Sequence, residues 1–327
     1  MAPFTAVVSY LIVSFDLFLE AFLLYMIIFR SPHSMRTFRI YLGVLCLNST
    51  ALSVVTGFIW QPEFTTHPIC IHTEGIFKSF LSNRLMSALS GALMVQHIQL
   101  LLSSYIYVYS KMNYFSFDLF TRRRAIWNVV FVLVPAIVFG IIVYHSNSSD
   151  SYAKHHVPFK LNGFVSPVCY FVADLKADGL VNYAIGFIFI YIITFISVAC
   201  YLLLKVHKKL KNPPSTTAPK TIQLQRMFFT NVLIQSLIPQ VLVSVPIVVA
   251  IGYEIIGHNR LGSVLFKISI MSVSLHSLVS CCLVLWVTKP YRRELLLMLH
   301  VKKPSSKDTL AMTVGMAVTR MRRKDDD

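Results

Sequence analysis

The sequence predicts an all-α integral membrane protein: a bundle of seven transmembrane helices followed by a short amphipathic helix. Three observations predict this class. The 327 residues are 55% hydrophobic and only 13% charged, with a mean hydropathy of +0.64, which ordinary water-soluble domains do not approach. Seven apolar stretches are long enough to cross a bilayer as helices. The cations lie in short runs between these stretches, as membrane topology requires.

The seven stretches define the expected spans. A bilayer core about 30 Å thick needs roughly 20 apolar helical residues. We place the spans at 6–29, 40–60, 79–109, 125–144, 179–204, 224–252 and 262–288. Runs this long are unlike the short alternating strands of a membrane barrel, so we expect helices. Pro239 and Pro246 each remove a backbone hydrogen bond, which predicts a kink in the sixth span.

The distribution of Lys and Arg predicts the orientation. Of the 30 cations, 23 lie in the loops 30–39, 110–124 and 205–226 and in the chain from residue 289 onward, against five in the opposite segments. By the positive-inside rule the C-terminus is cytoplasmic and the N-terminus extracellular, as an odd number of spans demands. The net charge of +16 therefore follows from topology, and we expect no nucleic-acid partner.

The stretch "WVTKPYRRELLLMLH", residues 286–300, predicts how the seventh span ends. Its cations are a stop signal at the inner leaflet, and Pro290 predicts a change of direction. The following leucines lie between cations, which favours a short amphipathic helix on the membrane surface. We expect one seven-helix domain over 1–301 and a polar, disordered cytoplasmic tail over 302–327.

Polar side chains inside the spans predict a cavity between the helices. Such groups are costly in a bilayer and therefore favour a functional site. The expected ligand-binding residues are Arg84, Gln96, His97, Gln235, Gln240, Lys267 and His276. Gln99 and the first-span pair Asp16 and Glu20, four residues apart on one face, are further polar groups of this kind. Pairing near an interface and hydrogen bonds between helices are the alternatives for each of them.

The outer loops carry two candidate covalent features. Cys70 and Cys169 are the two cysteines on the predicted extracellular side, which favours a disulfide, with two unpaired thiols as the alternative. Asn147 begins "NSS", a glycosylation acceptor, whereas the matching "NST" at Asn48 lies within a span. The other cysteines lie in spans and are expected as small buried hydrophobic residues: Cys46, Cys200, Cys281 and Cys282.

The sequence does not predict an enzyme, a cofactor or a metal site. It contains no "GxSxG", P-loop or "HExxH", and the histidines of the outer loops lack acidic or cysteine neighbours at ligand spacing. Lys267 could suggest a retinal Schiff base, but 24 residues separate it from Tyr291. That is about 36 Å of helix, so Lys267 lies near the outer surface and a photoreceptor is rejected.

Three stretches resemble a known receptor family. "YMIIFRSPHSMRTFRIYL" at 25–42, "TIQLQRMFFTNVLIQSLIPQ" at 221–240 and "VTKPYRRELL" at 287–296 are similar to nematode serpentine chemoreceptors of the Str superfamily, closest to the Srd and Srh types. The family pattern falls on Ser31, Pro32, Met35 and Arg36 in the first inner loop, on Leu224, Gln225, Gln235 and Pro239 in the sixth span, and on Pro290, Tyr291 and Arg292 after the seventh.

The resemblance implies an olfactory or gustatory receptor in the plasma membrane of sensory-neuron cilia. A small-molecule odorant or tastant would bind between the helices, move the sixth helix outward and activate a heterotrimeric G protein. The expected coupling face comprises Arg36, Arg39, Tyr105, Tyr107, Arg226, Tyr291 and Arg292. The chain departs from related receptors at "SSYIYVYSK", 103–111, which has no arginine at the end of the third span. A seven-helix channel subunit, a transporter and a receptor-like chain that does not signal are the alternative functions.

Overall fold

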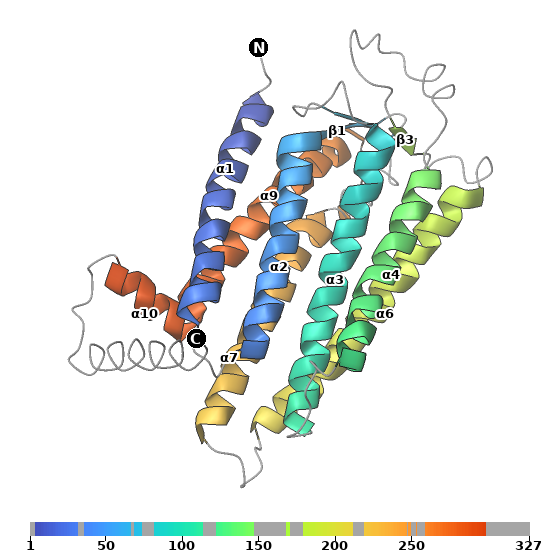
Figure 1. Cartoon of the computed structure of the whole chain (residues 1–327). Coiled ribbons are helices and arrows are strands. Elements are labelled where there is room, and N and C mark those ends of the chain that lie inside the picture. Colours follow the sequence, from blue (N-terminus) through green and yellow to red (C-terminus); the bar gives the residue numbers. More distant parts are fainter. Residues whose placement is uncertain are drawn as a thin grey trace, which may run out of the picture.

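Seven helices of 19 or more residues run alongside one another in the part of the chain that the structure describes (Figure 1). They are α1 (Phe4–Tyr25), α2 (Arg36–Val54), α3 (Asn83–Asn113), α4 (Arg122–Ser146), α6 (Gly179–Lys211), α7 (Pro219–Pro239) and α9 (Asn259–Val287). This structure is a computed structural model. It describes residues 4–31, 36–66, 69–73, 82–113, 122–146, 168–170, 179–211, 219–246, 248–249, 253 and 259–298.

The helical fold class predicted from composition is confirmed. Five stretches are long and apolar enough to cross a membrane among the residues whose side chains are described: Val7–Arg30, Phe38–Trp60, Arg84–Lys111, Arg124–His145 and Ile222–Val243. A sixth candidate is a bent pair of helices at the end of the bundle. The helix ends differ from the expected spans chiefly in α6, which continues past residue 204 to Lys211. Its added end is rich in lysine, so the helix extends beyond the apolar stretch that hydropathy detects.

Short π-helical turns extend three of the helices. They are η1 (Met26–Arg30) after α1, η3 (Val55–Trp60) after α2 and η4 (Gln240–Ser244) after α7. In η4 the backbone N–H of Val245 bonds to the carbonyl of Gln240, five residues earlier. The turn follows Pro239 directly, and Pro239 has no N–H to donate to the preceding turn. The predicted irregularity of the sixth span therefore takes the form of a π-helical turn.

The chain turns sharply after α9. Helix α10 (Lys289–Met298) leaves the axis of the preceding helix at 91°. Pro290 stands in its first turn, where a missing N–H costs nothing, and the backbone N–H of Arg292 bonds to the carbonyl of Thr288. The expected amphipathic helix after the seventh span is confirmed. We call the end of the bundle at which α1 ends and α10 begins the inner end (Figure 1).

A small antiparallel sheet lies at the opposite, outer end (Figure 1). Its strands are β1 (Pro62–Thr66), β2 (Ile69–Thr73) and β3 (Val168–Tyr170), in that order. The sequence did not indicate these strands, because segments of three to five residues carry little periodicity and their pairing joins distant parts of the chain. In the register of β2 and β3, Cys70 stands opposite Cys169.

The largest apolar cluster lies toward the inner end. It joins side chains from six of the long helices and from α10, including Leu23, Met26, Tyr105, Val232 and Tyr291. By contrast, large apolar side chains remain exposed on the outer faces of α1, α4 and α6, such as Phe18 at 68% and Trp127 at 64% exposure. Apolar surface of this kind is stable against lipid tails, and the membrane assignment accounts for it.

Candidate functional site

A belt of polar side chains crosses the middle of the bundle. It contains Asn48 of α2, His97 of α3, Gln235 of α7 and His276 of α9, all of them buried. The Asn48 amide donates to the backbone carbonyl of Leu93 at 3.2 Å and lies 3.4 Å from Nδ1 of His97. The rings of His97 and His276 meet edge to face, with centroids 6.0 Å apart. Four helices therefore contribute to one polar layer.

A small cavity of about 20 Å³ opens in this layer. His97 and Gln235 line it, together with Leu23, Leu45, Cys46, Ser49, Ser277, Ser280, Cys281 and Val284. A space of this size holds about one water molecule. Small-molecule sites usually enclose several hundred Å³, so a ligand could enter here only if the helices moved apart.

The structure brings together three of the seven residues expected to bind a ligand. His97, Gln235 and His276 meet in the polar layer. Arg84 lies 13 residues before His97 on α3, about 20 Å nearer the outer end. Lys267 lies nine residues before His276 on α9, about 14 Å in the same direction, and its side chain is outside the described residues. Gln96 and Gln240 are half-buried.

An acidic pair in α1 proves more deeply buried than its sequence setting suggested. Asp16 and Glu20 are one helical turn apart and are 0% and 1% exposed. Ser277 of α9 donates a hydrogen bond to Oε1 of Glu20. Both carboxylate oxygens of Asp16 and Oε2 of Glu20 have no hydrogen-bond partner. The i, i+4 spacing predicted a shared face, but only the packing shows that this face points into the bundle.

Hydrogen bonds tie α7 to its neighbours near the inner end. The Tyr105 hydroxyl of α3 lies 2.5 Å from Oγ of Ser236 and 3.5 Å from the carbonyl of Val232. The Asn231 amide donates to Oγ1 of Thr288 at 2.9 Å, at the bend between α9 and α10. All of these side chains are buried. Asn231, Ser236 and Thr288 were missed by the sequence analysis, since nothing local marks which face of α7 meets α3 and α9.

The tyrosines expected on the coupling face are inside the bundle in this conformation. Tyr105 and Tyr291 are fully buried, and Tyr107 stacks against Tyr41 with ring centroids 5.4 Å apart. The Tyr291 hydroxyl lies 2.6 Å from Oγ of Ser31, which joins α10 to the end of α1. That these tyrosines meet a G protein stays a prediction.

The arginines expected on the same face make local contacts. Arg39 donates to the carbonyl of Ile28 at 3.3 Å, and Arg226 donates to the carbonyl of Leu210 at 3.0 Å. The guanidinium of Arg292 lies over the ring of Trp286. The Arg36 side chain, the glycosylation acceptor Asn147 and the predicted tail 302–327 are outside the described residues.

Comparison with known proteins identifies one family. The model of the family described as "Serpentine type 7TM GPCR chemoreceptor Srh" matches residues 2–301, which is nearly the whole chain. A search of curated proteins found no match. The matched region includes all the described helices and the polar layer between them.

Proposed function

The chain belongs to the serpentine type 7TM GPCR chemoreceptor family Srh, and on that premise we propose that it binds a small molecule between its helices and activates a heterotrimeric G protein. It would act as a receptor and not as an enzyme. The family membership and the membrane-spanning helices are the observations from which this proposal starts. Ligand binding, coupling to a G protein and location in sensory cilia are the properties that we propose.

Two hydrogen bonds that hold α7 near the inner end are the basis of the coupling mechanism that we propose. Tyr105 joins α7 to α3 through Ser236, and Asn231 joins it to Thr288. Outward movement of α7 must separate both pairs, and separated polar groups in a dry core cost free energy. We therefore assign this conformation to the resting state. A ligand that favours the open state would repay that cost by binding it more tightly.

Tyr105 also offers an explanation for how the chain functions without an arginine at the end of the third span. In this conformation the hydroxyl of Tyr105 makes the buried contact between α3 and α7. A neutral hydroxyl costs far less to bury than a guanidinium would. We propose that this chain holds its resting state with a tyrosine and meets the G protein through cations on its inner loops, among them Arg36, Arg39 and Arg226.

The polar layer supports a ligand site that widens on activation. His97, Gln235 and His276 would form its floor, and Arg84, Gln96, Gln240 and Lys267 would lie toward its mouth at the outer end. We propose that an odorant or tastant with hydrogen-bonding groups enters from the outer end. Its insertion beside α7 would then displace the helix that the inner-end hydrogen bonds retain.

A cell-based assay tests the proposal. The full chain is expressed with an epitope tag at its N-terminus, and G-protein activation is measured at equal surface expression with and without volatile and water-soluble compounds. We expect at least one compound to activate the receptor, and we expect His97→Ala to weaken that response. The proposed signalling function would be contradicted if no compound activated any G protein and if Asn231→Ala, which releases α7 from Thr288, left basal activity unchanged.

A further inference from the structure

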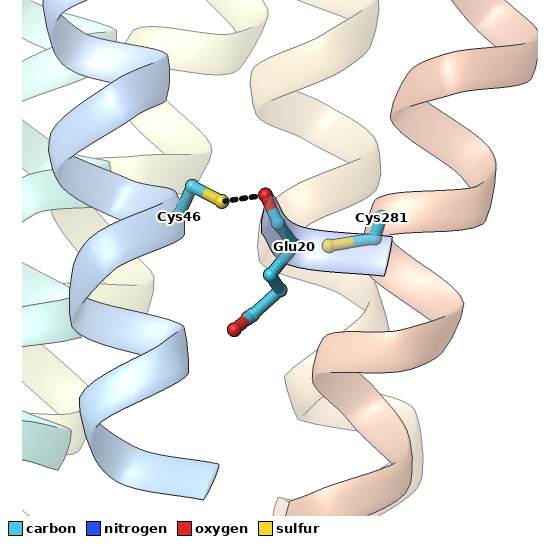
Figure 2. Close-up of side chains that lie close together, drawn as sticks. All are labelled: Glu20, Cys46 and Cys281. Carbon is cyan, nitrogen blue, oxygen red and sulfur yellow. Dashed lines mark hydrogen bonds between the residues drawn. The ribbon is translucent and has the colours of Figure 1, made fainter. Parts of the chain in front are cut away.

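A carboxylate and two thiols from three helices converge inside the bundle. The side chains of Glu20 of α1, Cys46 of α2 and Cys281 of α9 lie close together (Figure 2). Each of the three residues is at most 5% exposed. One carboxylate oxygen of Glu20 and the Sγ atoms of the two cysteines lie within 4.8 Å of one another. Sγ of Cys46 also approaches the backbone carbonyl of Glu20 at 3.9 Å. This cluster lies beside the histidine layer, because Cys46 and Cys281 line the same cavity as His97 and Gln235, but its three donor residues have no role in the proposed function.

The carboxylates beside this cluster lack partners. Ser277 donates to Oε1 of Glu20, whereas Oε2 of Glu20 and both oxygens of Asp16 have no partner at hydrogen-bond geometry, although the hydroxyls of Ser53 and Ser277 lie near Asp16. The ion pair between Arg30 and Glu294 lies at the inner end, away from α1's acidic face. Buried carboxylates are stable only when they are paired, protonated or bound to a cation. The cluster therefore has carboxylate oxygens free to bind a cation, and a bound cation would offset the free-energy cost of burying an unpaired carboxylate.

The donor set selects the kind of cation. Thiol sulfur favours Zn²⁺ and similar thiophilic ions, whereas sites for hard cations such as Mg²⁺ and Ca²⁺ are built from oxygen atoms. Zinc binds sulfur at about 2.3 Å and carboxylate oxygen at about 2.0–2.2 Å, which puts its ligand atoms roughly 3.5–4 Å apart. We propose that Glu20, Cys46 and Cys281 form a binding site for a thiophilic divalent cation of the zinc class. Small side-chain rotations would bring the three donors to that separation.

The proposed site also has room for a fourth zinc ligand and a balanced charge. The cavity of about 20 Å³ is lined by Cys46, Ser277 and Cys281, and it has room for about one water molecule as the remaining ligand. Each thiol gives up its proton when its sulfur binds the metal. One divalent cation thus replaces two protons, and the net charge of the interior does not change. Such a site would join α1, α2 and α9 through a single ion.

The test uses the purified full chain in detergent or nanodiscs, stripped of metal with a chelator. Zn²⁺ is added, and bound metal per chain and the thermal unfolding midpoint are measured. Cd²⁺ is then added as a spectroscopic probe, because thiolate ligands give it a charge-transfer absorption in the ultraviolet. We expect one bound ion per chain, a higher unfolding midpoint, and an absorption that corresponds to two thiolates.

Matched variants assign the ligands. Cys46→Ser with Cys281→Ser should lower Zn²⁺ affinity at least tenfold and abolish the cadmium band. Cys200→Ser with Cys282→Ser, which changes two exposed cysteines on α6 and α9, should leave both unchanged. Cys281→His keeps a zinc ligand, so it should retain Zn²⁺ binding with one thiolate fewer in the cadmium band. This variant separates loss of a ligand from loss of the fold.

Several outcomes would overturn the site. Folded wild-type chain that shows no cadmium–thiolate band has no such site, whatever the variants do. The assignment also fails if Zn²⁺ stabilises the double-serine variant as much as the wild type. Stabilisation by Na⁺ or Ca²⁺ but not by Zn²⁺, and dependent on Glu20, would show a hard-cation site instead. These measurements need neither ligand nor G protein, so their result is separate from that of the signalling assay.

Discussion

At the scale of single residues, buried polar side chains determine which helices are held together. The buried side chains of Tyr41 and Ser103 and the half-buried side chain of Asn128 join α2, α3 and α4, with the Ser103 hydroxyl 2.5 Å from Oδ1 of Asn128. Tyr105 and Asn231 in turn hold α7. The first group lies among helices that the proposed mechanism leaves in place. The second group must separate if α7 moves.

Replacing Tyr105 by phenylalanine should raise basal signalling. The change removes the hydroxyl that contacts Ser236, while Ser236 keeps its bond to the carbonyl of Leu233. The resting state would lose about 1 kcal/mol relative to the open state, a shift of roughly fivefold in their ratio. Ligand-independent G-protein activation at equal surface expression measures the effect. Tyr201→Phe, at an exposed position on α6, is the control, and equal basal activity in both variants would refute the role given to Tyr105.

At the scale of elements, close packing between α3 and α4 anchors one side of the bundle. Gly91 of α3 faces Phe139 of α4, and Gly140 of α4 faces the backbone of Ala88. Small residues let helices approach closely in a bilayer, where association relies on van der Waals packing. The pair is thus a fixed frame against which α7 can move.

Adding one methyl group at Gly91 should destabilise this frame. A Cβ there would lie 2.9 Å from Cε1 of Phe139, a buried ring with little room to withdraw. Overpacking of this kind costs about 1–3 kcal/mol, which exceeds the gain of up to about 1 kcal/mol from better helix propensity. Gly91→Ala should therefore lower the thermal unfolding midpoint of the purified chain.

Gly43→Ala in α2 provides the matched comparison. The nearest atom to its added Cβ would be Cγ2 of Ile27 at 3.8 Å, an ordinary contact. The midpoint of this variant should stay level or rise, because alanine is the better helix former. If the two variants unfolded at the same temperature, α3 and α4 would not be packed as described.

The helices were predictable from the sequence, whereas several contacts between them were not. Hydropathy located the long helices, because a bilayer imposes the same demand on every spanning segment. Pattern analysis likewise predicted α10, whose leucines and cations are local. It missed the strand pairing, because that pairing joins segments distant in the chain. It named His97, Gln235 and His276, but could not show that these three side chains meet in one layer while Arg84 and Lys267 lie about 20 Å and 14 Å nearer the outer end.

At the scale of the whole molecule, the outer sheet connects loops that are far apart in sequence. Cys70 and Cys169 are directly opposed in the register of β2 and β3. Opposed Cα atoms in an antiparallel pair lie about 4.5–5.5 Å apart, within the range that a disulfide spans. The side chains are outside the described residues, so the bond itself stays a prediction.

Mass spectrometry of the non-reduced chain should find a peptide that links Cys70 to Cys169. Replacing both residues by serine should lower the thermal unfolding midpoint and surface expression, because the bridge restrains a loop of about 100 residues, worth up to about 4 kcal/mol. The exposed pair Cys200→Ser with Cys282→Ser is again the control. Two free thiols at 70 and 169 in surface-expressed receptor would exclude the bridge.

The sequence by itself determined that this chain is a helical membrane protein, and it predicted the positions and orientation of the spans. Those properties depend on local composition, because lipid acts on each segment separately. Only the tertiary structure decided which polar residues meet. It joined Tyr105 to Ser236, Asn231 to Thr288, and Glu20 to two cysteines. Such contacts depend on the rotation and depth of each helix against its neighbours, which no single segment encodes.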